Sequence, residues 1–139
     1  AREQAGIPIT GPGESSLLLG TCGDRKFSMV TVSLERAAIK RRLVRDAGLD
    51  VNRLVSSHAT GMPVLEMRKD PKSAQKILIE NMKDAKNRGA DVMILGCMTL
   101  AFIPPKLLKE AQEEAGLLLI NPVVTAVKMA EALVAISKY

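Results

Sequence analysis

Short apolar runs alternate along the chain with longer segments in which apolar residues recur every three or four positions. Four short runs predict β-strands, at residues 27–32, 54–56, 91–95 and 117–120. The helical spacing predicts helices over residues 34–47, 71–89 and 104–115, and from Pro122 onward. Strand–helix alternation of this kind predicts an α/β fold, with a parallel four-stranded sheet and helices on both of its faces.

Local signals set the ends of these elements. Asp70 is a favourable N-cap residue and Pro71 a favourable first helical residue. Glycines follow three of the predicted helices and are expected to end them, at Gly48, Gly89 and Gly116. Residues 58–67 predict a loop with little regular structure. The run 7–13 predicts a strand end and a turn, before a helix around residues 15–19.

The composition favours one globular domain. The chain has 139 residues, of which 47% are hydrophobic and 25% charged, enough for a packed core. Aromatic residues make up only 2%, which argues against a binder of single-stranded nucleic acid, because such proteins stack bases on aromatic side chains. Much of the net charge of +5 comes from Lys40, Arg41, Arg42 and Arg45. We interpret this cluster as a solvent-exposed helix face, whose field would still favour an anionic small substrate.

Metal, membrane and disulfide chemistry are not expected. The chain has two cysteines, Cys22 and Cys97, without a CxxC motif, and one histidine, His58, too few ligands for zinc. Both thiols are expected to be free, as in the reducing cytoplasm. No apolar run approaches the ~20 residues of a membrane span, and no segment resembles a signal peptide. We therefore expect a cytoplasmic protein without a metal site.

Open parallel sheets bind ligands beyond the carboxyl ends of their strands. Such ends are expected at residues 31–33, 96–99 and 121–122. Gly96 leaves room for backbone N–H groups to face a ligand oxygen. Cys97 follows between a strand and the next predicted helix, a position that favours a reactive thiolate. The alternative is a buried cysteine that acts as a small hydrophobic residue.

Other polar residues are weaker candidates. Thr31 and Thr99 carry hydroxyls suited to a carboxylate, although threonine is also common in strands. Cys22 lies in a polar turn and is interpreted as an exposed bystander. His58 has no identifiable partner and is interpreted as a surface residue. Residues 11–14 lack the phosphate-loop pattern and are interpreted as a turn.

Four segments together indicate a family. Residues 27–36 read FSMVTVSLER, residues 59–66 ATGMPVLE, residues 89–98 GADVMILGCM and residues 120–123 INPV. In order and spacing they resemble the FSVVTTLER, TGIPVLEL, GADVIVLGCAGM and IDPV segments of the aspartate/glutamate/hydantoin racemase family, and hydantoin racemases above all. The segment with the cysteine is the most specific. The resemblance covers nearly the whole chain and implies one lobe of a two-lobed α/β fold.

The resemblance also implies an activity. Members of this family racemise amino acids or their derivatives without a cofactor, using one cysteine from each lobe on opposite faces of the α-carbon. By position, Cys97 would be the acid/base of the second lobe, acting on a hydantoin or amino-acid derivative. The residues implied to line the substrate are Thr31, Val32, Gly96, Met98, Thr99 and Pro122. Met98 and Thr99 stand where the family has Ala and Gly, which leaves the substrate's identity open.

The first-lobe cysteine of the family is expected to be missing. It precedes a helix that ends in ARE, and this chain begins at residues 1–3 with ARE; Cys22 does not match it. We expect residues 1–26 to be a remnant of the first lobe with its connection, and residues 27–120 to be the second lobe. Residues 121–139 are expected to form a helix returning towards the first lobe. A chain without half of its sheet is expected to form a homo-oligomer.

Two other functions remain open on the sequence. The first is a lyase similar to arylmalonate decarboxylases, which use a single protonating cysteine in this segment; release of carbon dioxide from a malonate would identify it. The second is a non-catalytic remnant that binds a ligand or forms oligomers. A thiol titration would test it: an ordinary pKa at Cys97, together with no protection of this thiol by hydantoins or amino acids, would favour that interpretation.

Overall fold

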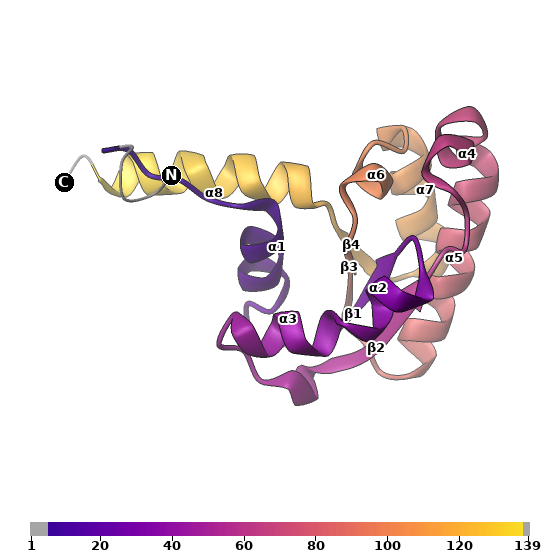
Figure 1. The fold of residues 1–139 in the computed structure, drawn as a ribbon, viewed down its shortest axis with the longest axis horizontal. Coiled ribbons are helices and arrows are strands. Elements are labelled where there is room, and N and C mark those ends of the chain that lie inside the picture. The colour runs from indigo at the N-terminus through magenta and orange to yellow at the C-terminus, as the bar shows by residue number, and fades with distance from the viewer. Residues whose placement is uncertain (1–5, 138–139) are drawn as a thin grey trace.

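A parallel sheet lies at the centre of the computed structural model, which describes residues 6–137 (Figure 1). Its strands are β1 (Phe27–Thr31), β2 (Leu54–Ala59), β3 (Val92–Leu95) and β4 (Leu118–Ile120). Their order is β2-β1-β3-β4, and every neighbouring pair is parallel. The predicted α/β fold with a parallel four-stranded sheet is therefore confirmed.

Helices cover both faces of this sheet, as predicted. They are α1 (Pro12–Gly20), α2 (Leu34–Ala38), α3 (Lys40–Asp46), α4 (Val64–Lys69), α5 (Pro71–Asn87), α6 (Met98–Ala101), α7 (Pro105–Ala115) and α8 (Pro122–Ile136), with a 3₁₀ turn at Val51–Arg53. Helices α1 and α3 lie on one face and α5 and α7 on the other (Figure 1). Within the described residues, no helix is long and apolar enough to cross a membrane.

Alternation along the strands creates two cores. Met29 and Ile94 point to the face covered by α1 and α3, where Leu17 and Val44 pack against them. Val30 and the α5 and α7 residues belong to a larger core on the opposite face. Because side chains of a strand alternate between faces, each central strand contributes to both cores.

The local end signals were reliable. Asp70 caps α5, and its Oδ1 accepts a hydrogen bond from the Ser73 backbone N–H at 3.0 Å. Helix α7 ends at Gly116, whose φ of 60° lies in the left-handed region that glycine enters without strain. Gly48 and Gly89 have positive φ angles as well.

The predicted single helix over residues 34–47 is wrong, because the chain breaks at Ile39 into α2 and α3. Its inward face consists of Ala37, Lys40 and Val44, whereas Leu34 is 77% exposed. Apolar spacing alone could not find this face, since one of its three members is a lysine.

The predicted loop over residues 58–67 is also wrong in part. Pairing with β1 extends β2 through His58 and Ala59, which lie opposite Val30 and Thr31. Helix α4 then begins directly after Pro63. Strand pairing with a distant segment decided the first difference, and no local signal records such pairing.

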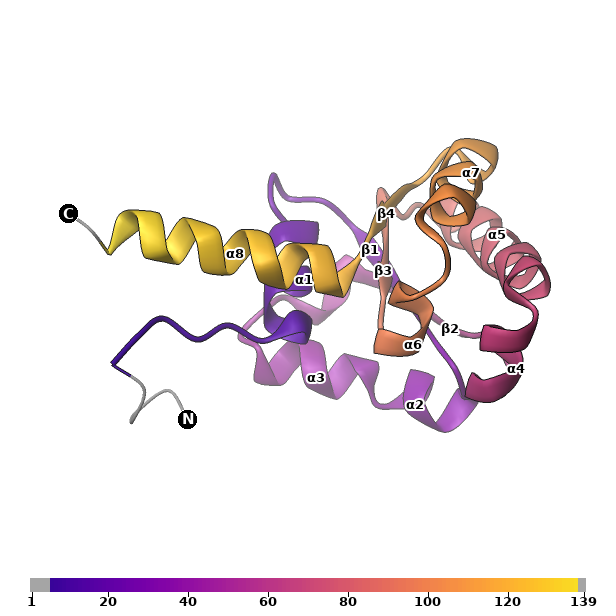
Figure 2. The same ribbon diagram turned by 90° about the horizontal axis from the view of Figure 1, so that it is seen from above.

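Residues 11–14, interpreted as a turn, instead open a helix, because Pro12 takes the first position of α1. The helix α1 packs beside α8, and the hydroxyls of Ser16 and Thr125 form a buried hydrogen bond of 3.0 Å. Figure 2 shows α8 extending well beyond the sheet. The division at residues 26 and 120 remains a prediction, and residues 1–5 and 138–139 lie outside the described part.

Candidate active site

The connections that leave the carboxyl ends of the central strands β1 and β3 lead to opposite edges of the sheet. From β1 the chain moves outward to β2, and from β2 it returns past β1 to β3 and β4. Ligands of open α/β sheets bind at such a switch point. Gly96 lies there, held by a hydrogen bond of 2.7 Å from its N–H to the carbonyl oxygen of Val30.

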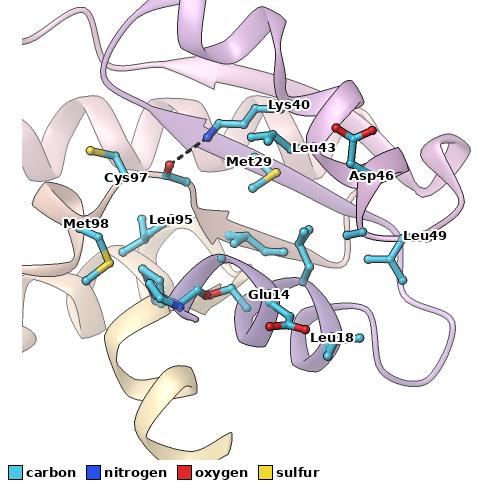
Figure 3. A pocket seen from close by; sticks show the side chains of 18 residues that line it. Glu14, Leu18, Met29, Lys40, Leu43, Asp46, Leu49, Leu95, Cys97 and Met98 are labelled. Atoms are coloured by element: carbon cyan, nitrogen blue, oxygen red, sulfur yellow. Dashed lines mark hydrogen bonds between the residues drawn. The ribbon is translucent and has the colours of Figure 1, made fainter. Parts of the chain in front are cut away.

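A cleft of about 470 Å³ opens beside this point, between the sheet, α1 and α3 (Figure 3). Its walls are mostly apolar and include Leu17, Met29 and Leu43. Three charged residues line it: Lys40, Glu14 and Asp46. The cleft has the form of a small-molecule site, with apolar walls and few polar groups.

Cys97 lies at the edge of the cleft, on the residue before α6. Its backbone is extended, with φ −140° and ψ 132°, and its side chain is half-buried against the core on the α5 side. Its sulfur points away from Leu43 and the interior of the cleft (Figure 3). The short helix α6, which starts at Met98, was not predicted.

Lys40 is the residue that the sequence did not reveal. Only 7% of it is exposed, and its Nζ donates a hydrogen bond of 3.0 Å to the carbonyl oxygen of Gly96 (Figure 3). Burial lowers the pKa of Lys40; a negative charge on the neighbouring Cys97 would oppose this, and Arg36 adds to it. The interpretation of Lys40 as part of a solvated face is therefore wrong, whereas Arg41, Arg42 and Arg45 are exposed as expected.

Gly96 is required for this arrangement by close packing. A Cβ on residue 96 would lie 3.1 Å from the carbonyl oxygen of Val30 and 3.3 Å from Nζ of Lys40. Any larger residue would push the lysine away from the strand end. The absence of a side chain thus allows the ammonium to reach the residue next to Cys97.

The structure brings together some of the predicted site residues. Gly96, Cys97, Met98 and Pro122 line the 470 Å³ cleft. Met98 also lines a second cleft of about 570 Å³, together with Thr99.

Thr31 and Val32 line neither cleft. Val32 packs against the core on the α5 side. Thr31 is 1% exposed, and its Oγ1 has no hydrogen-bond partner among residues 6–137. Thr31 and Thr99, the two hydroxyls suited to a carboxylate, therefore do not line a common cleft, and their role in binding stays a prediction.

His58 is not a surface residue. Its side chain is 9% exposed, with Nε2 at 2.8 Å from the Ser56 hydroxyl and Nδ1 at 3.8 Å from Asp84 Oδ2. The Ser56 hydroxyl in turn lies 2.7 Å from the Ser28 hydroxyl, and Ser28 shares the face of β1 with Val30. These residues line neither cleft, so the histidine belongs to the packing of β2 against α5. Cys22 is exposed, as predicted.

Comparison with known proteins adds a family to this geometry. The Asp/Glu/hydantoin racemase family model matches residues 1–130. The chain is 32% identical to the hydantoin racemase of Rhizobium meliloti over 134 residues, which are 96% of this chain and 54% of that protein. It is also 32% identical to the hydantoin racemase of Pseudomonas sp. (strain NS671) over 139 residues, 99% of this chain and 54% of the relative.

Solved structures agree with the fold. The allantoin racemase from Pseudomonas fluorescens superimposes with a TM-score of 0.82 at 26% identity, covering 94% of this chain and 54% of that one. The allantoin racemase from Klebsiella pneumoniae gives a TM-score of 0.79 at 29% identity, covering 94% and 51%. The chain therefore spans about half the length of these relatives, in agreement with the expectation of one lobe.

Proposed function

Because the chain belongs to the Asp/Glu/hydantoin racemase family, we propose that it racemises hydantoins or related amino-acid derivatives without a cofactor, with Cys97 as an acid/base. The observation that carries the proposal is the position of this cysteine just beyond the carboxyl end of β3, on the edge of an apolar cleft. The substrate class follows from the hydantoin and allantoin racemases that the chain resembles.

In the proposed reaction, the Cys97 thiolate removes the proton from the carbon beside a carbonyl group. The electron pair of the broken C–H bond moves towards the carbonyl oxygen, which gives an enolate. A proton returned by the same thiol restores the original configuration. A proton returned from the opposite face inverts it, and inversion therefore needs a second acid.

We propose that this second acid is the cysteine of a first lobe, as the resemblance implies. Residues 27–120 would then be the second lobe, with α8 returning towards the first. Cys22 is not a candidate for the second acid, because it is exposed on the connection between α1 and β1 and lines neither cleft. We also propose that the chain forms a homo-oligomer.

Isotope exchange tests the role of Cys97 separately from inversion. One enantiomer of 5-methylhydantoin is incubated with the protein in D2O, and α-deuterium is measured by NMR while configuration is followed by chiral chromatography. Cys97 acting alone is expected to introduce deuterium with retention. Linking the chain to the first-lobe half of a hydantoin racemase is expected to add inversion.

Cys97→Ser should slow exchange at least ~100-fold, since the group that moves the proton is lost. Cys22→Ser is the matched control and should exchange at the wild-type rate above the uncatalysed background. Wild-type exchange by the Cys97→Ser protein would refute the proposal.

A further inference from the structure

Lys40 is a buried cation for which the described part of the chain supplies no counter-ion. Among residues 6–137, no carboxylate lies within ion-pairing distance of its Nζ, and its hydrogen-bond partner is the neutral carbonyl of Gly96. An ammonium has three N–H donors, so two of them remain available. Buried charges in proteins are normally paired, because an unpaired charge loses its hydration without compensation.

The two carboxylates that line the cleft do not fill this role. Asp46 lies at the far end of α3 and pairs with Arg42 at 3.6 Å, with both side chains exposed. Glu14 points from α1 on the opposite wall, away from Lys40 (Figure 3). The ammonium thus lies where Gly96 and Cys97 line the cleft, while the acids lie elsewhere along its walls.

A second buried polar group lies on the same face of the sheet. Strand alternation places Thr31 on the side of Met29, which lines the cleft. Its hydroxyl is buried and lacks a partner within the described residues. Thr31 lines neither cleft, so of these two groups it is Lys40, which lines the cleft, that is placed to meet an anionic oxygen of a ligand.

We propose that Lys40 binds an anionic group of the ligand in the cleft, so that this site prefers a carboxylate-bearing compound to its neutral isostere. The preference for a carboxylate-bearing hydantoin rests on the proposed function. The binding of a simple carboxylate by Lys40 is independent of the proposed function. Burial lowers the pKa of Lys40, and a carboxylate bound beside the ammonium would raise it.

Two pairs of probes of nearly equal size test the proposal by calorimetric titration. Hydantoin-5-acetate is compared with hydantoin-5-acetamide, and propionate with propionamide. Lys40→Met and Lys40→Gln remove the charge, and Lys40→Gln keeps a donor for the Gly96 carbonyl. Arg45→Met removes a charge from the exposed face of the same helix and is the control.

The wild-type protein and Arg45→Met are expected to bind each carboxylate about tenfold more tightly than its amide, as for one charge-assisted hydrogen bond. Both Lys40 variants should lose this preference while binding the amides unchanged. Equal binding of acid and amide by the wild type, or an unchanged preference in both folded Lys40 variants, would overturn the proposal.

The two hypotheses fail in different ways. If neither hydantoin binds, the proposed function is contradicted, and the propionate pair still decides the role of Lys40. If both hydantoins bind equally well, the proposed function stands and the anion site is refuted.

Discussion

Adding one methyl group at Gly96 should destabilise the protein. The Cβ of Gly96→Ala would lie 3.1 Å from the Val30 carbonyl oxygen and 3.2 Å from Cε of Lys40, so neighbours must move by a few tenths of an ångström. The oxygen cannot move freely, because it accepts the Gly96 N–H at 2.7 Å. Overpacking costs about 1–3 kcal/mol, and the lower entropy of the unfolded alanine chain offsets about 0.4–1 kcal/mol. We expect a net loss of about 1–2 kcal/mol.

Urea denaturation measures this loss from the shift of the midpoint at an unchanged slope. Gly13→Ala in the first turn of α1 is the control, because among residues 6–137 no heavy atom beyond its chain neighbours and the local helix backbone lies within 4 Å of the added Cβ. The control should be neutral or more stable by up to about 1 kcal/mol. A Gly96→Ala protein as stable as the wild type would refute the packing argument.

A double-mutant cycle separates the two neighbours. Lys40→Ala removes Cε and Nζ and leaves only the contact with the Val30 oxygen. If the lysine carries part of the strain, Gly96→Ala should cost at least about 0.5 kcal/mol less in that background. The same cost in both backgrounds would assign the strain to Val30 alone.

Three further predictions concern stability. Burial lowers the pKa of His58 in the folded protein, while Asp84 raises it and Arg88 lowers it. As pH falls, the unfolded chain therefore binds the proton first. Stability should fall as pH drops through about 6.5 and below, by at most about 1.4 kcal/mol per pH unit. Urea midpoints across pH 5–7.5 should show this slope, and His58→Gln should lack it. Gly116→Ala should lose about 1 kcal/mol in the same assay because φ is 60°, while Gly116→Asn should lose less. Lys40→Met should be at least as stable as the wild type, since it removes a buried charge; a loss above about 1 kcal/mol would contradict this.

Local chemistry explains what the sequence could predict. Strand runs, the Asp70–Pro71 start of α5 and the glycine after α7 act within a few residues, and the structure contains them all. Cys97 could be singled out in the same way, because it follows the apolar run of β3 after a single residue, Gly96. Its place at the cleft edge agrees with that choice, although its role remains a prediction.

Contacts between distant segments explain what was missed. The sequence groups Lys40 with three exposed arginines, and only the approach of Gly96, which directly follows β3, distinguishes it from them. His58 resembles a lone loop histidine until pairing with β1 places it inside the sheet. In both cases the partner lies tens of residues away, and no spacing rule within one element records it.

Lys40, which reaches the carboxyl end of β3 from α3, departs from the rule that buried helix positions are apolar. An apolar side chain at this position would complete the inward face with Ala37 and Val44 at no electrostatic cost. The lysine instead brings a charge into the fold, and its side chain packs where a Cβ of residue 96 would crowd it. Proteins break local rules of this kind mainly at functional sites, where stability is exchanged for binding. If Lys40→Met gains stability while losing the preference for carboxylates, the exchange at this cleft is measured directly, and the charge beside Cys97 is explained by its ligand rather than by the fold.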